Sequence, residues 1–242
     1  MKNTVELKDV CKSLGSKEVF RDLNLAIPAG VITAIVGESG SGKTTLLSLI
    51  NGVGFADSGS TYVFGEPVTR ENLLQTQRRI GYAVQGAGLF PHLTAEENIS
   101  IVARSIGMKS DLIKKRVRML LRLVHLDQEL LKNFPHALSG GQQQRVGLCR
   151  AMMLNPSLIL LDEPFSSLDP ITRKALHSEI IELQKATSVT IVIVTHDISE
   201  AMKLSQRIVV LKDGALVQED SPENITSQPA NQYVNDLLEA MS

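Results

Sequence analysis

The run VITAIVGESGSGKT, residues 31–44, decides the fold. Its first half, VITAIV, is a short β-branched run that fits a buried strand, and we expect a helix to begin near Thr44. Between them, Gly37 to Thr44 match the pattern G-x-x-x-x-G-K-[ST] at every fixed position. A glycine-rich turn from a strand into a helix points backbone N–H groups at a bound phosphate, where the helix dipole adds positive potential. We therefore interpret GESGSGKT as a phosphate-binding loop rather than a simple turn.

The residues of this loop have the chemistry that a nucleoside triphosphate requires. The glycines allow the backbone turns that aim N–H groups inward. Lys43 can reach the β- and γ-phosphates, and the hydroxyl of Thr44 can ligate Mg²⁺. The residues that we predict to bind ATP here are Gly37, Glu38, Ser39, Gly40, Ser41, Gly42, Lys43, Thr44 and Thr45.

A pair of carboxylates ends a second buried-strand run. The stretch SLILLDEP, residues 157–164, closes an apolar segment with Asp162 and Glu163. A carboxylate at the C-terminal end of such a strand lies on the ligand side of a parallel sheet. We expect Asp162 to bind Mg²⁺ and Glu163 to orient or deprotonate an attacking water. The alternative for either residue is a helix cap or an ion-pair partner.

Strand and helix patterns alternate through much of the chain and predict an α/β fold. The first thirty residues alternate around Gly15 as short antiparallel strands would. Buried-strand runs recur at 157–162, 190–196 and 207–214, and the helical run DPITRKALHSEIIELQKAT separates the first two. This order predicts a mostly parallel, doubly wound sheet core with an N-terminal antiparallel part.

The middle of the chain has a different pattern. Residues 94–138 are helical only and are interpreted as an inserted helical subdomain. The predicted organisation is a single domain over 1–242, in which 1–93 and 139–242 form the sheet core. A chain of 242 residues with 43% apolar composition can bury such a core without disulfides.

A second glycine-rich run, LSGGQQQRV at residues 138–146, precedes another helical pattern. Its glycine N–H groups suit a phosphate as well. The alternative is a helix N-cap, in which Ser139 caps and the glycines end the preceding segment. That alternative explains Ser139 well and the two glycines less well, because glycine inside a helix costs about 1 kcal/mol.

Composition excludes several classes of protein. The net charge is −1 and aromatic residues make up 4% without any tryptophan, which disfavours a nucleic-acid binder. Two cysteines are too few for a disulfide framework or a zinc site, so we expect reduced thiols, with Cys149 buried and inert. The polar start at Met1 does not resemble a signal peptide, and no apolar run approaches the roughly 20 residues that span a bilayer. We expect a soluble protein of the cytoplasm.

Six motifs taken together resemble the nucleotide-binding subunits of ABC transporters. In that family's order they are GESGSGKT, the glutamine of GYAVQ at Gln85, LSGGQQQR, LILLDE, SSLD at residues 166–169 and the histidine of VTHD at His196. The resemblance implies a P-loop NTPase fold of the ABC type, with ATP and Mg²⁺ as its ligands. It also implies catalytic roles for Glu163 and His196, and Mg²⁺ ligation by Thr44, Gln85 and Asp162.

The same resemblance assigns the second glycine run to a different nucleotide. Two copies of the family's subunit pack head to tail about a two-fold axis, and each signature run closes over the ATP that the other copy holds. The signature residues implied here are Ser139, Gly140, Gly141 and Gln142. Asp169 would cross this interface and couple the two sites.

The position that stacks on adenine departs from the family's pattern. The family usually has an aromatic residue there, and the matching residue is Leu14. A leucine contacts the ring but offers no π face, so we expect weaker affinity or looser base selectivity. Phe20 is a second candidate, although its place in the alternation favours the core.

Two further runs resemble importers of quaternary amines such as glycine betaine, choline or carnitine. They are GLFPHLTAEENI at residues 88–99 and EPFSSLDPITRK at residues 163–174. The implied partners are a second copy of the chain, integral membrane permease subunits and, indirectly, a solute-binding protein, but no nucleic acid. The implied location is peripheral, on the cytoplasmic face of the inner membrane. A C-terminal ionic-strength sensor is not expected, since the sequence stops at Ser242.

Other functions remain open alongside import. They are an exporter or lipoprotein-translocating ATPase of the same fold, and a soluble ABC ATPase without a transport role.

The cation-rich run KKRVRMLLRLV, residues 114–124, has two interpretations. It is either a solvated helix face or a contact for a lipid headgroup or an acidic partner surface. The groove for a permease helix is expected elsewhere, near Gln85 to His92.

Overall fold

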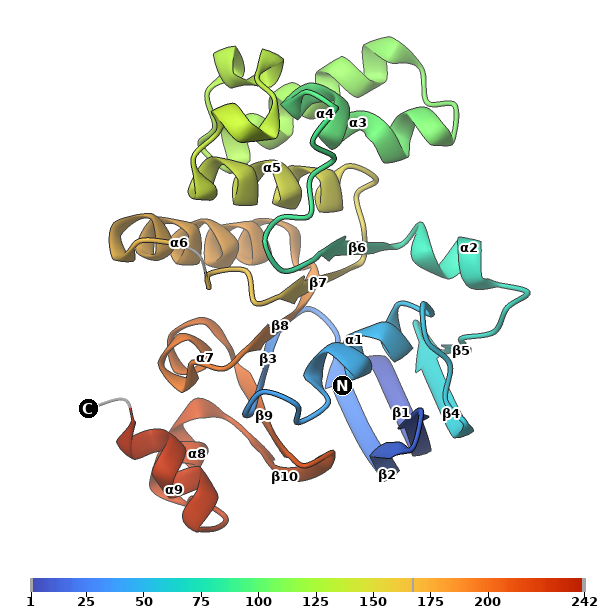
Figure 1. Cartoon of the computed structure of the whole chain (residues 1–242), viewed down its shortest axis with the longest axis vertical. Helices are drawn as coiled ribbons and strands as arrows, with labels where there is room; N and C mark the ends of the chain where they lie inside the picture. The colour runs from blue at the N-terminus through green and yellow to red at the C-terminus, as the bar shows by residue number, and fades with distance from the viewer. Residues whose placement is uncertain (1, 167, 241–242) are drawn as a thin grey trace. The chain divides into compact units, whose positions relative to one another are not determined.

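The computed structural model describes residues 2–166 and 168–240. Contacts between residues divide the chain into two compact units. Figure 1 labels the helices and strands of both. The first unit comprises Met1–Gln77 and Thr190–Ser242, and the second comprises Arg78–Val189. Ser167, within the predicted SSLD motif, lies outside the described residues.

An antiparallel sheet opens the first unit. Its strands are β1 (Asn3–Leu14), β2 (Lys17–Pro28), β4 (Ser58–Val63) and β5 (Glu66–Pro67), in the order β2-β1-β4-β5. Leu14 pairs with Lys17 across a two-residue turn, in which Gly15 has φ 61°. The predicted antiparallel start of the chain is confirmed, but β1 and β2 are each 12 residues long rather than short.

The same unit contains parallel strands. They are β3 (Ile32–Val36), β8 (Thr190–Thr195) and β9 (Arg207–Lys212), with β10 (Ala215–Asp220) antiparallel to β9, in the order β10-β9-β3-β8. The central strand β3 pairs in parallel with both β8 and β9. Every residue of β3 and β8 is buried, as expected for β-branched runs inside a parallel sheet.

Five helices accompany these strands in the described part of the first unit. They are α1 (Lys43–Ile50), α2 (Leu73–Gln77), α7 (Ile198–Leu204), α8 (Pro222–Ser227) and α9 (Gln232–Glu239). One buried cluster joins Ala34 and Val36 of β3 to Ile198 of α7, Ile225 of α8 and Val234 of α9. The C-terminal helices therefore pack on the strand that precedes the phosphate loop.

The second unit combines two parallel strands with helices. β6 (Ile80–Ala83) pairs in parallel with β7 (Leu158–Asp162). The helices are α3 (Ala95–Ser105), α4 (Ser110–Leu123), the short 3₁₀ turns η1 (Gln128–Lys132) and η2 (Pro135–Ala137), α5 (Gly140–Met152) and α6 (Pro170–Thr187). Residues 94–138 contain helices and no strand, as predicted.

The α/β fold with mixed sheets agrees with the prediction. The helix after the phosphate loop begins at Lys43, one residue before its predicted start, and the predicted helix after Asp169 is α6. In the described part of the chain, no helix combines the length and apolar character needed to cross a bilayer.

Candidate functional site

The phosphate loop connects β3 to α1, as the motif requires. Gly42 is the N-cap of α1, with φ 103°, and no side chain caps this helix end. The N–H groups of the first turn of α1 therefore lack a side-chain acceptor at the end where the helix dipole is positive. This geometry fits an anion at the loop.

Close packing beneath the loop explains why two of its positions are glycine. A Cβ on Gly42 would lie 2.6 Å from Cε1 of Phe20, and a Cβ on Gly37 would lie 2.2 Å from the carbonyl oxygen of Leu211. Phe20 is only 1% exposed. The suggestion that Phe20 contacts adenine is therefore wrong, because its ring is part of the core under the loop.

The side chain of Lys43 folds back over the phosphate loop. Its Nζ donates hydrogen bonds to the carbonyl oxygens of Gly37 at 2.7 Å and Glu38 at 2.8 Å. These bonds hold the ammonium group at the loop, where triphosphate oxygens are expected to bind. The buried hydroxyl of Ser41 has no hydrogen-bond partner in the described chain. An anionic ligand in the loop would suit both groups.

Leu14 lies at the end of the β1–β2 hairpin. Its side chain is 55% exposed although it is apolar. An exposed leucine at a hairpin tip is compatible with contact to an apolar ring, and it stays a predicted adenine contact. Lys17, which pairs with Leu14, has its Nζ 3.9 Å from the position of a Cβ on Gly40.

Strand register brings His196 to the same edge as the phosphate loop. Val36 pairs with Thr195 in the parallel β3–β8 ladder, so Gly37 and His196 leave neighbouring strands side by side. The His196 side chain is exposed. Asp197 caps α7 through the backbone N–H groups of Ser199 and Glu200, which fixes the turn after the histidine.

The carboxylate pair lies at the corresponding edge of the second unit. Ala83 of β6 pairs with Leu161 of β7, so the loop with Gln85 and the residues Asp162 and Glu163 leave the same end of these strands. Asp162 is buried, and the hydroxyl of Tyr82 donates to its Oδ2 at 3.5 Å. Burial first, and then the Asp162 carboxylate, raise the pKa of Tyr82 to about 12.

Glu163 has a backbone conformation that is uncommon for a non-glycine residue. Its φ is 47°, in the left-handed region. Strained conformations of this kind cost about 1–3 kcal/mol and concentrate at functional sites. The half-buried side chain is thus set by an unusual turn directly after the strand, which supports a catalytic assignment.

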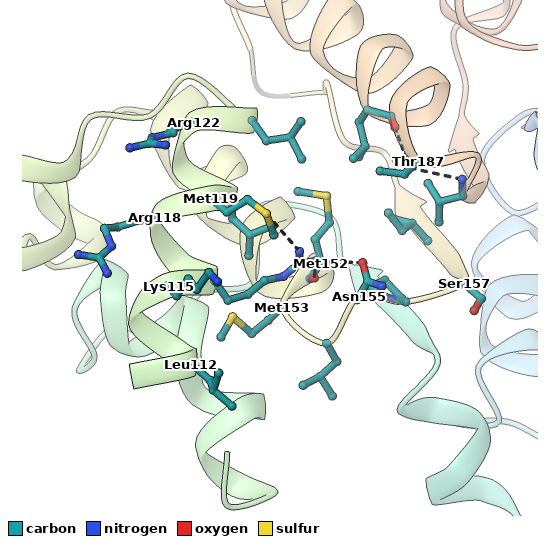
Figure 2. A pocket seen from close by; sticks show the side chains of 18 of the residues that line it. Leu112, Lys115, Arg118, Met119, Arg122, Met152, Met153, Asn155, Ser157 and Thr187 are labelled. Carbon is teal, nitrogen blue, oxygen red and sulfur yellow. Dashed lines mark hydrogen bonds between the residues drawn. The ribbon is translucent and has the colours of Figure 1, made fainter. Parts of the chain in front are cut away.

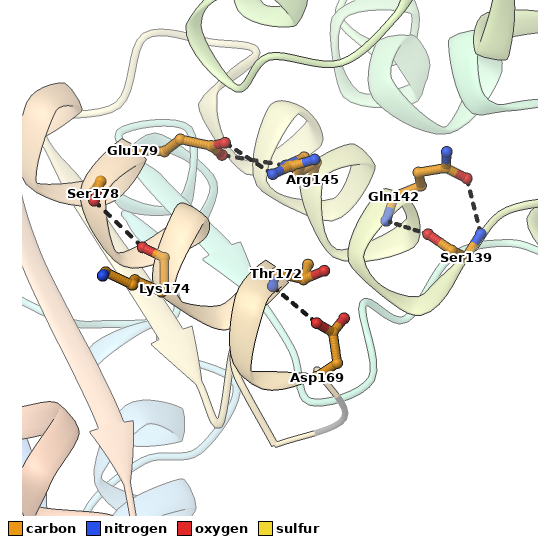
Figure 3. A network of polar contacts seen from close by, with 8 residues as sticks. All are labelled: Ser139, Gln142, Arg145, Asp169, Thr172, Lys174, Ser178 and Glu179. Atoms are coloured by element: carbon orange, nitrogen blue, oxygen red, sulfur yellow. Dashed lines mark hydrogen bonds and ion pairs between the residues drawn. The ribbon is translucent and has the colours of Figure 1, made fainter.

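The second glycine run begins α5 with a reciprocal capping box (Figure 3). The Ser139 hydroxyl accepts from the backbone N–H of Gln142 at 3.3 Å, and Oε1 of Gln142 accepts from the backbone N–H of Ser139 at 2.9 Å. Within this chain, the N-cap interpretation of Ser139 is therefore confirmed. Ser139 and Gly140 are exposed at the helix start.

Gly141 has a packing reason of its own. A Cβ at this position would lie 2.4 Å from Cγ2 of Thr172 on α6. A glycine here lets the first turn of α5 approach α6 closely. Gly141, which the capping interpretation did not explain, therefore has a structural role. Its additional role toward a nucleotide held by another copy stays a prediction.

Asp169 begins α6. Its Oδ1 accepts from the backbone N–H groups of Ile171 at 3.1 Å and Thr172 at 3.0 Å, and the residue is exposed. Hydrogen bonds from the Thr172 side chain and then from its backbone lower the pKa of Asp169. The coupling of two sites by Asp169 across a dimer interface stays a prediction.

An ion pair links the helix of the signature run to α6. The guanidinium of Arg145 donates to Glu179 from Nη2 at 2.9 Å and from Nε at 3.3 Å (Figure 3). Burial raises the pKa of Glu179, and the charge of Arg145 opposes this shift. Because the pair is bidentate and mostly buried, it fixes the orientation of α5 against α6.

The predicted metal ligands suit Mg²⁺ by their chemistry. Thr44, Gln85 and Asp162 offer hydroxyl, amide and carboxylate oxygens, and Mg²⁺ needs only one or two protein ligands beside phosphate oxygens and water. Among the described residues, no group of three or more His, Cys, Asp or Glu side chains is arranged to hold a metal. The donor set thus fits a magnesium ion that arrives with a nucleotide.

Two contacts at the site have no clear signal in the sequence. Tyr233 of α9 accepts a hydrogen bond from the backbone N–H of Glu38, and Phe20 packs under Gly42. The other predicted residues fall into two groups within their units. The first unit contains the phosphate loop, Leu14 and His196. The second unit contains Gln85, Asp162, Glu163, Asp169 and the signature run.

Comparison with known protein families gives one family match. The family model described as "ABC transporter" matches residues 20–166. The Bacillus subtilis protein named glycine betaine/carnitine/choline transport ATP-binding protein OpuCA is 44% identical over 224 residues. That alignment covers 93% of this chain and 59% of the relative. This chain therefore spans about three fifths of that relative's length.

Two further proteins extend the comparison. The Escherichia coli glycine betaine uptake system ATP-binding protein YehX is 40% identical, over 97% of this chain and 76% of its own length. Among solved structures, a dimeric post-hydrolysis ATP-binding cassette bound to ADP and Pi superposes with a TM-score of 0.82. It is 33% identical, with 90% of this chain and 98% of that chain covered.

Proposed function

Because the chain belongs to the ABC transporter family, we propose that it is the ATP-hydrolysing subunit of a transporter for uptake of a small solute, in the class of quaternary-amine osmoprotectants. The observation that carries the ATPase assignment is the uncapped start of α1, with Lys43 held over the glycine loop. It supports triphosphate binding directly, through N–H donors and one cation.

Binding of ATP uses the first unit. The backbone N–H groups from Gly40 to Thr45 surround the β- and γ-phosphates, and the Lys43 ammonium neutralises part of their charge. Leu14 contacts the adenine ring from the tip of its hairpin. Since a leucine lacks a π face, base selectivity comes mainly from shape.

Hydrolysis transfers the γ-phosphoryl group to water and yields ADP and inorganic phosphate. The Glu163 carboxylate accepts the proton of the attacking water, and His196 contacts the γ-phosphate and helps to hold that water. A magnesium ion on Thr44, Gln85 and Asp162 would supply charge neutralisation at the phosphate oxygens when bound. Gln85 also senses the transport partner in the membrane.

The active form is a head-to-tail pair of identical subunits. Ser139, Gly140, Gly141 and Gln142 of one copy close over the nucleotide of the other, and Asp169 couples the sites. The exposed position of Ser139 at a helix start supports this role, because the helix dipole favours an anion there. Loss of the γ-phosphate removes the charged bridge and reopens the pair. To shift the ratio of closed to open pairs from 1:99 to 99:1, ATP must bind the closed pair more favourably than the open pair by about 5.5 kcal/mol.

The transport role rests on the relatives. Both named proteins are transport ATP-binding proteins for glycine betaine or related amines, at 40% identity or more. Import of such a solute requires permease subunits in the membrane and a solute-binding protein that delivers the cargo. The chain then acts at the cytoplasmic face of the membrane, with residues 94–138 as its helical subdomain.

Substitution of Glu163 tests the ATPase mechanism. Glu163→Gln removes the proton acceptor but keeps the side-chain shape, so hydrolysis should fall by at least about a hundredfold. The variant should then form a stable dimer with Mg·ATP, measured by light scattering after gel filtration. Glu223→Gln, at an exposed position of α8, is the matched control. A Glu163→Gln protein that stays monomeric at saturating Mg·ATP would contradict the proposal.

Reconstitution with membrane subunits separates import from the alternatives. ATPase activity that rises when a solute-loaded binding protein is added supports import. Co-purification with a membrane subunit, without response to any binding protein, favours an exporter or a lipid-translocating system. Failure to associate with any membrane subunit, with ATPase activity that membrane subunits do not change, favours a soluble ABC ATPase.

A further inference from the structure

The three residues after Gln85 have an unusual backbone. Gly86, Ala87 and Gly88 have φ values of 70°, 61° and 49°, all in the left-handed region. The backbone N–H of Gly88 donates to the carbonyl oxygen of Gly86 at 2.7 Å, which closes a three-residue γ-turn around Ala87. A γ-turn with a positive φ at its centre is rare and strained. Such a turn persists only when the surrounding structure holds it.

Arg150, in the last turn of α5, supplies that support. Its Nη1 donates to the carbonyl oxygen of Gly88 at 2.8 Å, and its Nη2 donates to the carbonyl oxygen of Ala87 at 2.8 Å. The guanidinium carbon also lies 5.9 Å from the ring centroid of Phe90, within the range of a cation–π contact. One planar fork therefore binds two successive carbonyl groups of the turn, a geometry that suits arginine better than lysine.

Two helices hold the segment that contains this turn. The Ala87 side chain is buried, and a Cβ on Gly147 of α5 would lie 3.2 Å from the Ala87 carbonyl oxygen. Further along, the buried Asn98 of α3 accepts from the backbone N–H of Phe90 at 2.7 Å and donates to the carbonyl oxygen of Leu93 at 3.0 Å. In Figure 1 the segment runs from β6 past α5 to α3. The turn is therefore fixed from the α5 side, and the end of the segment from the α3 side.

No ion pair explains the position of Arg150. Within the described part of the chain it pairs with no carboxylate, and burial lowers its pKa. The dipole of α5 favours a cation near the C-terminal end of the helix. The dipole does not explain why both amino groups of the guanidinium reach carbonyl oxygens of a different segment. These two hydrogen bonds direct Arg150 to the turn after Gln85.

We propose that Arg150 is a positioning residue for Gln85. The guanidinium holds the γ-turn, and the turn fixes the direction in which the exposed Gln85 side chain leaves the segment. This inference rests on the proposed function, in which Gln85 is a ligand of the Mg²⁺ that arrives with the nucleotide. Arg150 acts through the backbone of residues 86–88 and not by touching the nucleotide or the metal.

Hydrogen exchange in the chain free of nucleotide and metal tests the support of the turn. Arg150→Met keeps a long side chain but removes both donors. The amides of residues 86–90 should then exchange at least about tenfold faster than in the wild type, measured by mass spectrometry. Arg150→Lys keeps the charge without the planar fork and should give an intermediate rate.

Arg116 of α4 provides a matched control in the same unit. It is also half-buried, and its Nη2 donates to the carbonyl oxygen of Met152 at 2.8 Å and to Oδ1 of Asn155 at 3.3 Å. Figure 2 labels both of these partners. Arg116→Met removes a guanidinium that binds the end of α5 but does not contact the turn, so exchange at residues 86–90 should match the wild type. Circular dichroism reports whether the variants fold, and Arg150→Lys with Arg116→Lys replaces the pair if Arg150→Met does not.

Metal affinity separates positioning from a purely structural role. Mn²⁺ serves as the probe, with the non-hydrolysable analogue AMP-PNP bound, and electron paramagnetic resonance measures its affinity without turnover. Arg150→Lys should weaken Mn²⁺ binding at least about tenfold, as loss of a group that orients a metal ligand does. Binding of AMP-PNP in the absence of metal should stay unchanged. In a Gln85→Ala background, Arg150→Lys should have no further effect on Mn²⁺ affinity, because both residues act through one contact.

The outcomes distinguish this inference from the proposed function. Exchange at residues 86–90 that stays slow in Arg150→Met, or that rises equally in Arg116→Met, would overturn the positioning role. An equal loss of Mn²⁺ affinity on Arg150→Lys with and without Gln85 would overturn it as well. Unchanged Mn²⁺ affinity in Gln85→Ala, together with fast exchange in Arg150→Met, would contradict the proposed metal role of Gln85, on which the inference rests.

Discussion

The hydroxyl of Tyr233, on α9, accepts a hydrogen bond from the backbone amide of Glu38 at 3.3 Å. Glu38 is the second residue of the phosphate loop, and Tyr233 follows it by 195 residues. The Tyr233 ring is buried, and the ammonium of Lys212 lies 4.3 Å from its centroid. The C-terminal helix therefore supports the entry of the loop that we propose binds ATP.

We expect Tyr233→Phe to weaken nucleotide binding while the fold stays intact. The substitution keeps the packed ring but leaves the Glu38 amide without this acceptor, and one such hydrogen bond contributes about 1 kcal/mol, or roughly fivefold in affinity. Titration with a fluorescent ATP analogue measures the effect. The control is Tyr62→Phe, because the Tyr62 ring lies under the ammonium of Lys8 on another sheet. Equal affinities of Tyr233→Phe and wild type would show that the contact does not position the loop.

Gly42→Ala should destabilise the chain more than a glycine substitution at an open turn. The new Cβ would overlap Phe20 at 2.6 Å, whereas Gly65, with φ 84°, has no atom within 4 Å of its Cβ position. Left-handed strain costs about 1–2 kcal/mol in both variants, and the overlap adds about 1–3 kcal/mol at Gly42. Urea unfolding of Gly42→Ala and Gly65→Ala compares them. Equal losses of unfolding free energy would mean that the Phe20 contact does not constrain the loop.

Two substitutions at Ser139 separate its cap from its proposed role toward a second nucleotide. Ser139→Ala removes the N-cap and should cost about 1 kcal/mol of unfolding free energy. Ser139→Asp keeps a good cap but places a carboxylate where a γ-phosphate of the partner copy would lie. We expect Ser139→Asp to retain stability and single-site ATP binding but to lose ATP turnover. Normal turnover in a stable Ser139→Asp protein would leave the residue with its capping role alone.

Features set by neighbouring residues in the chain could be predicted from the sequence. The phosphate loop, the acidic end of β7 and the caps at Ser139 and Asp169 depend on spacings of a few residues and on backbone geometry. The order of strands and helices follows from apolar periodicity. These parts of the fold and of the candidate site appear in the structure where the sequence indicates them.

Features set by contacts between distant residues could not be predicted. The hydrogen bond from Glu38 to Tyr233 and the approach of Gly141 to Thr172 depend on how elements pack. Strands β4, β6 and β10 also lack a buried β-branched run. β6 has only four residues, one of them a glycine, and most residues of β10 are half-exposed. For β6 and β10, pairing with a neighbouring strand decides the conformation in place of local propensity.

Breaking the ion pair between α5 and α6 should strongly destabilise the second unit. Glu179→Ala leaves the Arg145 guanidinium, whose side chain is mostly buried, without its carboxylate. Removal of one partner of a buried pair costs about 3–5 kcal/mol. Thermal unfolding measures the loss, and Arg145→Met/Glu179→Leu should recover most of it because both charges are gone. A double variant as unstable as Glu179→Ala would indicate that packing rather than charge explains the loss.

The dependence of stability on pH gives a separate test of the same carboxylate. Burial raises the pKa of folded Glu179 above its ordinary value of 4.5, so the folded chain binds this proton more tightly than the unfolded chain. That contribution to stability is complete below the unfolded pKa and is lost as pH rises through the folded pKa. Glu179→Gln cannot titrate, so its unfolding free energy relative to wild type should increase as pH rises from about 4 toward neutrality. Urea unfolding in steps across this range measures the difference, with Glu129→Gln, at an exposed position of the same unit, as control. A difference that stays constant, or that decreases with pH, would mean that the Arg145 charge outweighs burial at this site.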